Sequence, residues 1–485
     1  MNISLNNPEL FVEKAFINGK WVSADNAKTF DVHNPSDNSI IGNVPDMRAD
    51  ETKRAIDAAE KAFHSWKKQS AEFRSNLLRK WFDLMIENVD DLGKILTLEQ
   101  GKPLAEAKGE VLYGASFVEW FAEEAKRIYG DVIPGNTENS RIVVLKQPIG
   151  VVGAITPWNF PNAMITRKVG PALAAGCTVV LKPPGLTPFS ALALAKLAEK
   201  AGFPPGVFNI VTTTRSSVVG TELTSSKIVK KLSFTGSTEI GKLLMKQCAD
   251  TVKKVSMELG GNAPFIVFND ANVEKAVQGA IASKYRNAGQ TCVCTNRILV
   301  QSGIKEEFLK HYVKAVDNLK VGDGMQKNVE IGPLIDQGAI DKVEDLVKDA
   351  LDNGASLMTG GNKYKQDSLY YQPTVICDVN SQMNIADEEI FGPVSTIFEF
   401  ETEEEAIQIA NDTPFGLASY FYGNNMSQIW RVAEALEYGM VGINTGKIST
   451  TVAPFGGIKE SGIGREGSKY GIEEYMEIKY LNFEI

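Results

Sequence analysis

The chain has 485 residues, a formal net charge of −9 and 43% hydrophobic residues. This length exceeds what one hydrophobic core usually serves, so two or three domains are expected. The negative charge repels polyanions and argues against nucleic acid as a partner. No apolar stretch is long enough for a membrane span, which predicts no membrane partner. The first fourteen residues lack the features of a secretory signal or a transit peptide, so we expect a cytoplasmic protein.

The five cysteines are too few and too scattered for a disulfide scaffold, which also favours a reducing compartment. No cluster of histidine and cysteine has the spacing of metal ligands, so no metal site is expected.

Short β-branched runs alternate with segments of helical period through the middle of the chain. Strands are predicted over 151–155, 178–181, 207–211 and 231–234, with a helix over 190–201. A second set follows, with strands over 264–268 and 297–300 and helices over 273–285 and 306–319. This alternation predicts α/β domains with parallel sheets and helices on their faces.

Two alternating segments, 142–147 and 475–484, lie outside both sets. Each has the pattern of a strand with one polar face. They are either strands that pair with another subunit or ordinary edge strands of this chain.

Cys292 lies in a polar turn, Gly289-Gln290-Thr291-Cys292, whereas structural cysteines usually lie on apolar faces. This context favours a reactive thiol. None of the three histidines lies in a motif that would serve a thiol nucleophile, so a cysteine protease is disfavoured. Glu258, in Met257-Glu258-Leu259-Gly260-Gly261-Asn262, is the candidate for a subsequent proton transfer.

Three further segments follow predicted strands, where ligands of parallel sheets bind. Phe234-Thr235-Gly236-Ser237 opens a helix whose N-terminus favours a phosphate, with Ser237 as N-cap, although an ordinary strand–turn–helix has the same pattern. Lys182 is a candidate ligand for ribose or phosphate, or else a solvated loop lysine. Asn159, between two prolines, is either an oxyanion donor or a turn residue.

Six runs, in this order and over nearly the whole chain, resemble the signature motifs of the aldehyde dehydrogenase superfamily. They are Thr156-Pro157-Trp158-Asn159-Phe160-Pro161, Phe234-Thr235-Gly236-Ser237, Met257-Glu258-Leu259-Gly260-Gly261-Asn262, Gly289-Gln290-Thr291-Cys292, Glu389-Ile390-Phe391-Gly392-Pro393 and Pro454-Phe455-Gly456-Gly457. Within the superfamily, the runs around Arg167, Arg286, Cys294 and Arg465 resemble the bacterial succinate-semialdehyde dehydrogenases.

The resemblance implies a Rossmann-type cofactor domain (1–125 and 149–258), an α/β catalytic domain (259–440) and a small β oligomerisation arm (126–148 and 470–485). It also implies a homo-oligomer, which we expect to be a tetramer built as a dimer of dimers.

The implied chemistry begins with attack of the Cys292 thiolate on an aldehyde, with the oxyanion held by Asn159 and the backbone N–H of Cys292. Hydride transfer then gives a thioester, which water activated by Glu258 hydrolyses to a free acid. The implied cofactor-binding residues are Thr156, Trp158, Asn159, Lys182, Pro184, Gly185, Gly236, Ser237, Leu259, Glu389 and Phe391. A catalytically silent homologue would have lost the nucleophile, the base or the oxyanion donor, and this chain keeps Cys292, Glu258 and Asn159.

The choice of cofactor depends on position 185. NAD-selective relatives often carry a glutamate there, which binds the 2′-hydroxyl, and this chain has Gly185. Without that carboxylate a 2′-phosphate meets less repulsion, and Lys182 remains to pair with it. We therefore expect NADP to be preferred and NAD to be possible.

For the substrate, the clamp residues of the family correspond to Arg167, Arg286 and Ser449, which together suit a distal carboxylate. Each arginine alone is as well explained by an ion pair with a neighbouring acid. The implied substrate is succinate semialdehyde, with glutarate semialdehyde as the alternative. Lys447 departs from the family pattern, in which this residue is apolar, and leaves open a preference for four or five carbons.

Cys294, two residues after Cys292, suggests a reversible disulfide that switches the enzyme off. The alternative is a packing residue, since bridging at this spacing requires a bent backbone.

Overall fold

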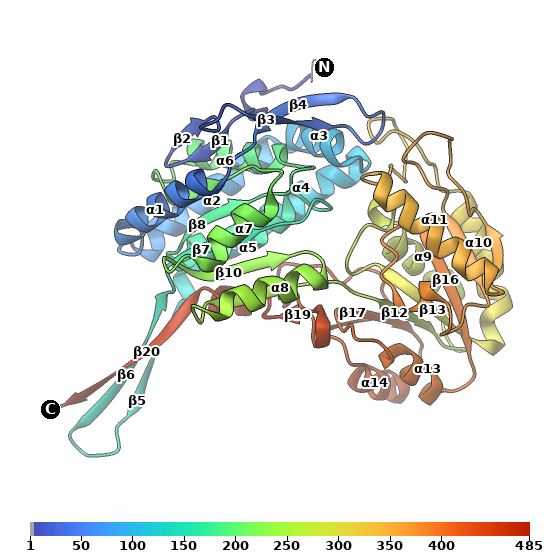
Figure 1. Cartoon of the computed structure of the whole chain (residues 1–485). Helices are drawn as coiled ribbons and strands as arrows, with labels where there is room; N and C mark the ends of the chain where they lie inside the picture. Colours follow the sequence, from blue (N-terminus) through green and yellow to red (C-terminus); the bar gives the residue numbers. More distant parts are fainter. Residues whose placement is uncertain (1–3) are drawn as a thin grey trace.

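The computed structural model describes residues 4–485 of the chain. Two lobes lie side by side, and a narrow arm projects from the first and carries the C-terminus at its tip (Figure 1). Each lobe is built around one large sheet with helices on both faces. The α/β class predicted from the alternation of strands and helices is confirmed.

The first sheet is mostly parallel and eight-stranded, in the order β19-β11-β10-β7-β8-β9-β1-β2. Its strands are β1 (Ala15–Ile17), β2 (Lys20–Val22), β7 (Val151–Ile155), β8 (Thr178–Lys182), β9 (Phe208–Ile210), β10 (Val229–Thr235), β11 (Lys254–Glu258) and β19 (Gly462–Ile463). The three central residues of β8, Val179 to Leu181, are fully buried. Each such side chain stabilises the fold by roughly 1.5–3 kcal/mol relative to an exposed one.

The chain reverses its direction of travel across this sheet between β7 and β10. From β7 it moves one way to β8 and β9, and it then crosses back to β10 and β11. Because such crossovers are right-handed, the first pair of connecting helices lies on one face and the second pair on the other. These helices are α5 (Ala163–Ala175), α6 (Phe189–Ala201), α7 (Ser216–Ser225) and α8 (Thr238–Ala249). A crevice at the carboxyl ends of β7 and β10 is therefore the expected ligand site.

Four N-terminal helices complete the first lobe. They are α1 (Ala49–Trp66), α2 (Ala71–Glu87), α3 (Val89–Gln100) and α4 (Leu104–Glu124). Helix α1 packs beside α7 against β7 and β8, whereas α2, α3 and α4 form an outer layer over α5 and α6. A hairpin of β3 (Thr29–His33) and β4 (Ile40–Pro45) lies outside the main sheet.

The second lobe has a seven-stranded sheet in the order β14-β15-β16-β13-β12-β17-β18, parallel except for β14. Its strands are β12 (Ala263–Val267), β13 (Thr295–Gln301), β14 (Ser356–Thr359), β15 (Thr374–Cys377), β16 (Val394–Phe400), β17 (Ala418–Tyr422) and β18 (Met440–Ile443). Its helices are α9 (Val273–Lys284), α10 (Lys305–Asp317), α11 (Gln337–Asp352), α12 (Asn384–Asp387), α13 (Glu403–Asn411) and α14 (Met426–Ala435).

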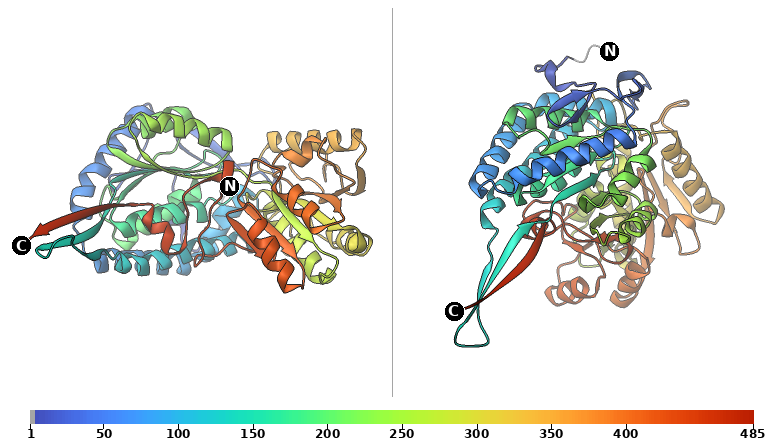
Figure 2. Two further views of the ribbon diagram at one scale, coloured as in Figure 1. Left: turned by 90° about the horizontal axis from the view of Figure 1, so that it is seen from below. Right: turned by 60° about the vertical axis from the view of Figure 1, so that its left-hand side comes forward.

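The arm is a three-stranded antiparallel sheet in the order β20-β6-β5, and both views in Figure 2 show it extending away from the lobes. Its strands are β5 (Asp131–Pro134), β6 (Ser140–Pro148) and β20 (Met476–Glu484), the last preceded by α15 (Ser468–Glu473). The strands predicted over 142–147 and 475–484 are thus present. Large apolar side chains on the arm are exposed, among them Val132 at 78% and Ile478 at 72%. Pairing with another subunit stays a prediction, as do the domain boundaries.

Helix α8 differs in detail from its prediction. Ser237 is its N-cap residue, as expected, but the Ser237 side chain makes no capping hydrogen bond. Ile240 and Leu243 follow the helical spacing, yet they lie on the outer face and are 43% and 49% exposed. Leu244, which shares the helical spacing, is buried together with Gly241 and Cys248. No helix in residues 4–485 is long and apolar enough to cross a membrane.

A buried ion pair connects α4 to the loop after β7. Lys102 Nζ lies 2.6 Å from Glu110 Oε2 and donates to the carbonyl of Asn159 at 2.7 Å. The other oxygen of Glu110 accepts the backbone N–H groups of Asn162 and Ala163 at the start of α5. Because both charged side chains are almost fully enclosed, the loss of either one leaves the other buried without its partner.

We expect Lys102→Met to lower the free energy of unfolding by about 3–5 kcal/mol, the typical cost of breaking a buried pair. Urea denaturation followed by circular dichroism measures this change. Lys108→Met on α4 is the matched control, because the pair of Lys108 with Asp90 is exposed and should contribute less than about 1 kcal/mol. Equal losses in the two variants would contradict the buried-pair account.

Candidate active site

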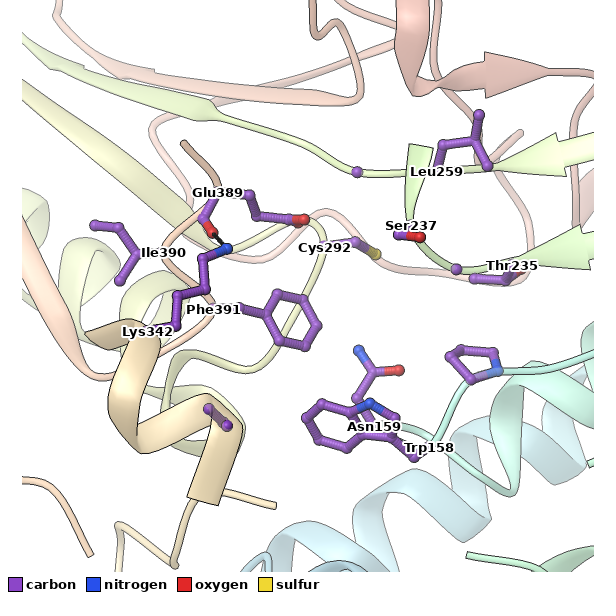
Figure 3. Close-up of a pocket in the computed structure, with 15 residues that line it drawn as sticks. Trp158, Asn159, Thr235, Ser237, Leu259, Cys292, Lys342, Glu389, Ile390 and Phe391 are labelled. Atoms are coloured by element: carbon purple, nitrogen blue, oxygen red, sulfur yellow. Dashed lines mark hydrogen bonds between the residues drawn. The ribbon is translucent and has the colours of Figure 1, made fainter. Parts of the chain in front are cut away.

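The loops after β7, β10 and β11 meet a loop of the second lobe that carries Cys292. Together they enclose a pocket of about 340 Å³, shown in Figure 3. The pocket lining contains many of the residues that the sequence predicts, namely Trp158, Asn159, Gly236, Ser237, Leu259, Cys292, Glu389 and Phe391. The site therefore lies where the strand order of the first sheet reverses, and the second lobe closes it.

The loop that carries the cysteine is held in an unusual backbone conformation. Asn287 and Ala288 have φ values of 54° and 55°, and Gly289 follows at 76°. A left-handed conformation is costly for residues with a Cβ and persists only where surrounding contacts enforce it. Here the Asn287 side chain donates to the carbonyls of Asn159 and Gln290, both at 3.1 Å, and Glu106 accepts the Asn287 N–H at 2.9 Å.

Asn159 contacts this loop directly. Its Nδ2 donates to the carbonyl of Gln290 at 3.0 Å, which occupies one of the two amide hydrogens. The second hydrogen is free for another acceptor. The Asn159 side chain is buried, and its Oδ1 has no hydrogen-bond partner among the described residues. This geometry fits a donor to a developing oxyanion better than a turn residue.

Burial raises the pKa of the Cys292 thiol to about 12. The charges of Glu389 and Glu258 act in the same direction, whereas Arg167 and Arg286 lower the pKa. In the protein without a bound ligand, the Cys292 thiol is therefore protonated at neutral pH. Additional positive charge near the sulfur would favour the thiolate.

Glu258 is the last residue of β11, and its Oε2 is buried without a partner in residues 4–485. Burial raises the pKa of Glu258 well above its usual range, and the charge of Glu466 raises it further. Gly456 lies beside it, since a Cβ at that position would come within 3.0 Å of Glu258 Oε1. A carboxyl with a raised pKa in such a site suits a general base near neutral pH.

Glu466 forms a buried charge cluster that the motif analysis missed. Its Oε1 lies 2.6 Å from Lys168 Nζ, and its Oε2 lies 2.5 Å from Arg167 Nη2. Burial opposes ionisation of Glu466, but Arg167 and Lys168 together hold its pKa at about 2. The sequence signal for this cluster is weak. Lys168 adjoins Arg167, and Glu466 adjoins Arg465, in runs that resemble the family.

Arg167 therefore forms an ion pair with Glu466, which is the alternative to a clamp role that the sequence left open. Its guanidinium also lies 3.9 Å from the ring of Phe455. Arg286 lies over the ring of Phe160 at 5.1 Å. Arg286, Lys447 and Ser449 line a separate cavity of about 10 Å³, and the Lys447 side chain is exposed.

Glu389 and the aromatic pair of Trp158 and Phe391 also line the main pocket. Glu389 accepts the N–H of Gly261 at 3.2 Å, and burial raises the pKa of Glu389 to about 7. The rings of Trp158 and Phe391 meet edge to face, 5.6 Å apart. In Figure 3 Asn159, Cys292 and Glu389 project into the same space.

Lys182, Pro184, Gly185 and Thr156 lie outside the lining of this pocket. Lys182 ends β8, and its carbonyl accepts the N–H of Thr156 at 3.3 Å. Burial alone lowers the pKa of Lys182 to about 8, so no carboxylate is close enough to raise it. Gly185 faces Thr213, because a Cβ on Gly185 would lie 3.3 Å from the Thr213 carbonyl.

Cys294 is buried, and its thiol donates to the carbonyl of Gly289 at 3.2 Å. The N–H of Cys294 bonds to the carbonyl of Thr291 at 3.0 Å, so the backbone between the two cysteines is bent. All five cysteines are free. The Cys292–Cys294 bridge stays a prediction, and it would require the Cys294 thiol to leave Gly289.

Comparison with known proteins identifies the family. A model of the aldehyde dehydrogenase family matches residues 21–481. The chain is 59% identical to succinate-semialdehyde dehydrogenase [NADP(+)] of Escherichia coli and 59% identical to glutarate-semialdehyde dehydrogenase of Pseudomonas aeruginosa, and each match covers 99% of both chains. A crystal structure described as an E. coli NADP dependent enzyme superposes with a TM-score of 0.99 at 59% identity, over 99% of this chain and 100% of the other. The chain therefore belongs to the aldehyde dehydrogenase family.

Proposed function

We propose that the protein oxidises succinate semialdehyde to succinate with a nicotinamide dinucleotide, through a thioester on Cys292. The observation that carries this proposal is the set of groups around one sulfur. Asn159 and Glu389 share a pocket with Cys292, and two arginine charges act on the thiol. The relatives named above act on aldehydes with a distal carboxylate, which supports an anionic substrate.

The pocket fits a nicotinamide dinucleotide. Asn159 Oδ1 and Thr235 Oγ1 belong to residues of the pocket lining, are buried and have no partner within residues 4–485, so a polar ligand could satisfy them. We assign Gly236 and Ser237 to the diphosphate, Glu389 to the nicotinamide ribose, and Trp158, Leu259 and Phe391 to the pocket walls. When bound, the dinucleotide accepts a hydride and brings a positive ring that favours the thiolate.

In the first step, the Cys292 sulfur attacks the aldehyde carbon and forms a tetrahedral adduct. The free N–H of the Asn159 amide and the backbone N–H of Cys292 then hold the oxyanion. Since Asn159 is already fixed by Gln290, little reorganisation is needed when the charge develops. The hydrogen bonds of Asn287 to Asn159, Gln290 and Glu106 hold the cysteine loop and the Asn159 amide in a fixed relative position.

In the last step, Glu258 takes a proton from the water that hydrolyses the thioester. Its raised pKa makes the carboxylate a stronger base than an exposed glutamate. The charge of Glu466 raises this pKa, whereas the charges of Arg167, Lys168 and Arg465 lower it.

Replacement of Glu258 by Gln should reduce the steady-state rate by about 100-fold or more, because water then lacks its base. The acylated enzyme should accumulate, and mass spectrometry of the intact protein detects the adduct on Cys292. In the wild type, hydrolysis should be lost as the pH falls through the raised pKa of Glu258, because the protonated carboxyl cannot accept a proton. A variant without accumulated thioester and with an unchanged pH profile would exclude this role.

Arg167, Arg286 and Ser449 form the proposed carboxylate clamp. Glutarate semialdehyde is the alternative substrate, since one relative with that activity is as similar as the succinate-semialdehyde enzyme. Lys447 lines the same small cavity as Arg286 and Ser449 and adds a charge near the proposed clamp. Parallel assays of both semialdehydes with the wild type decide between them.

Arg286→Ala should raise the KM for succinate semialdehyde by about 10- to 100-fold, because a charge-assisted hydrogen bond is lost. The KM for butanal, which has no carboxylate, should change little. Arg286→Lys keeps the charge but loses the forked donor geometry, so its KM for succinate semialdehyde should lie between those of the wild type and Arg286→Ala. Equal effects of Arg286→Ala on both aldehydes would refute the clamp.

We also propose that NADP is preferred over NAD, as the E. coli relative is named for NADP(+). Burial is the one cause that shifts the pKa of Lys182, and Gly185 places no side chain beside the Thr213 carbonyl. An added phosphate could therefore pair with the Lys182 ammonium without repulsion from a carboxylate at position 185.

Gly185→Glu should reverse this preference, because a carboxylate at 185 repels the 2′-phosphate and can bind a 2′-hydroxyl. We expect the ratio of kcat/KM for NADP to that for NAD to fall at least about tenfold, with a matching loss of NADP affinity in fluorescence titrations. Gly185→Ala adds bulk without charge and is the control. Wild-type kcat/KM with NAD equal to or greater than that with NADP would refute the proposal.

Finally, we propose a homotetramer, a dimer of dimers that assembles through the arm, and a cytoplasmic location. The exposed apolar side chains of the arm and the free state of all five cysteines support these two assignments.

A further inference from the structure

Tyr113 on α4 has a hydroxyl whose surroundings are unusual. The oxygen is buried, and no residue in 4–485 forms a hydrogen bond with it. Burial raises the pKa of Tyr113, whereas the charges of Arg167 and Arg286 lower it. Ser449 also lowers this pKa, although the two hydroxyls do not meet hydrogen-bond geometry. Tyr113 therefore lies among the three residues of the proposed carboxylate clamp.

The position of Tyr113 is fixed on both sides. Its ring meets that of Phe117 edge to face at 4.9 Å, and Phe117 lies 5.7 Å from the Arg167 guanidinium. The next residue, Gly114, brings α4 so close to α5 that a Cβ there would lie 2.3 Å from Asn162 Oδ1. Helix α4 is thus held against the segment that also carries Asn159.

The two strongest charges that act on Tyr113 belong to hydrogen-bond donors. Arg167 and Arg286 can only donate hydrogen bonds, so neither can accept the phenol hydrogen. A buried donor without a partner is unfavourable, and such groups in binding sites are usually satisfied by the ligand. An ionised carboxylate accepts at both oxygens and donates nothing, which matches this set of donors.

We propose that the Tyr113 hydroxyl donates a hydrogen bond to the distal carboxylate of the substrate and is a fourth member of the clamp. This inference rests on the proposed function, because it concerns the same substrate carboxylate. It gives Tyr113 a role in selecting anionic aldehydes over neutral ones. A site that binds its ligand through the Tyr113 hydroxyl also rejects an aldehyde without a carboxylate, because the buried hydroxyl then stays unpaired.

The test is Tyr113→Phe, which keeps the ring and its packing on Phe117 and removes one oxygen. We expect the KM for succinate semialdehyde to rise about 10- to 100-fold, as for loss of a hydrogen bond to a charged group. The kcat and the KM for butanal should stay within about twofold. Succinate, used as an inhibitor, should bind more weakly by the same factor as the KM rises, which gives a readout independent of turnover.

Tyr371→Phe is the matched control. The Tyr371 hydroxyl is also buried and unpartnered in the described part of the chain, but it lies in the core of the second lobe. Its removal should leave the preference for succinate semialdehyde over butanal unchanged.

The possible failures are distinguishable. A wild type that shows no preference for succinate semialdehyde over butanal overturns the proposed function. A wild type with that preference, and a Tyr113→Phe variant that keeps it together with normal succinate inhibition, overturns the role of Tyr113 alone. Equal losses with both aldehydes would assign Tyr113 to packing and would also refute the proposal.

Discussion

The chemistry of this site depends on how buried charges are balanced around one thiol. Glu466 pairs with both Arg167 and Lys168, at 2.5 and 2.6 Å, in a region where an unpaired charge would be strongly unfavourable. Arg167 in this cluster acts on the Cys292 thiol, and Glu466 raises the pKa of Glu258. The sulfur, the base and the clamp share one electrostatic environment.

The same balance explains why the lobes must meet at this point. The first lobe supplies Asn159 and Glu258 from the ends of parallel strands, and the second supplies Cys292 from a loop with left-handed backbone. Only where the lobes meet do the Asn159 amide and the Cys292 sulfur share a pocket. The buried pair of Lys102 and Glu110 fixes the Asn159 loop from behind, so the contact between lobes is stiff on the side of the first lobe.

Much of the fold was predictable because strand and helix periodicity is local. The segment 151–155 matches β7 in full, and the predicted helix over 273–285 differs from α9 by one residue. The motifs likewise predicted most of the residues that line the pocket. Glu466 and Tyr113 escaped prediction because their significance comes from contacts far apart in sequence.

The hydrogen bonds between Asn159 and the loop of the second lobe have a consequence for ligand exchange. Asn159 donates to Gln290, and Asn287 donates back to the Asn159 carbonyl, so two bonds join the lobes beside the nucleophile. Any motion that separated the lobes would pull the amide away from the sulfur and break both bonds, leaving the Asn159 amide without its Gln290 partner. Substrate and product must therefore enter and leave while the lobes remain joined, and turnover requires only local side-chain and loop motion around a closed joint.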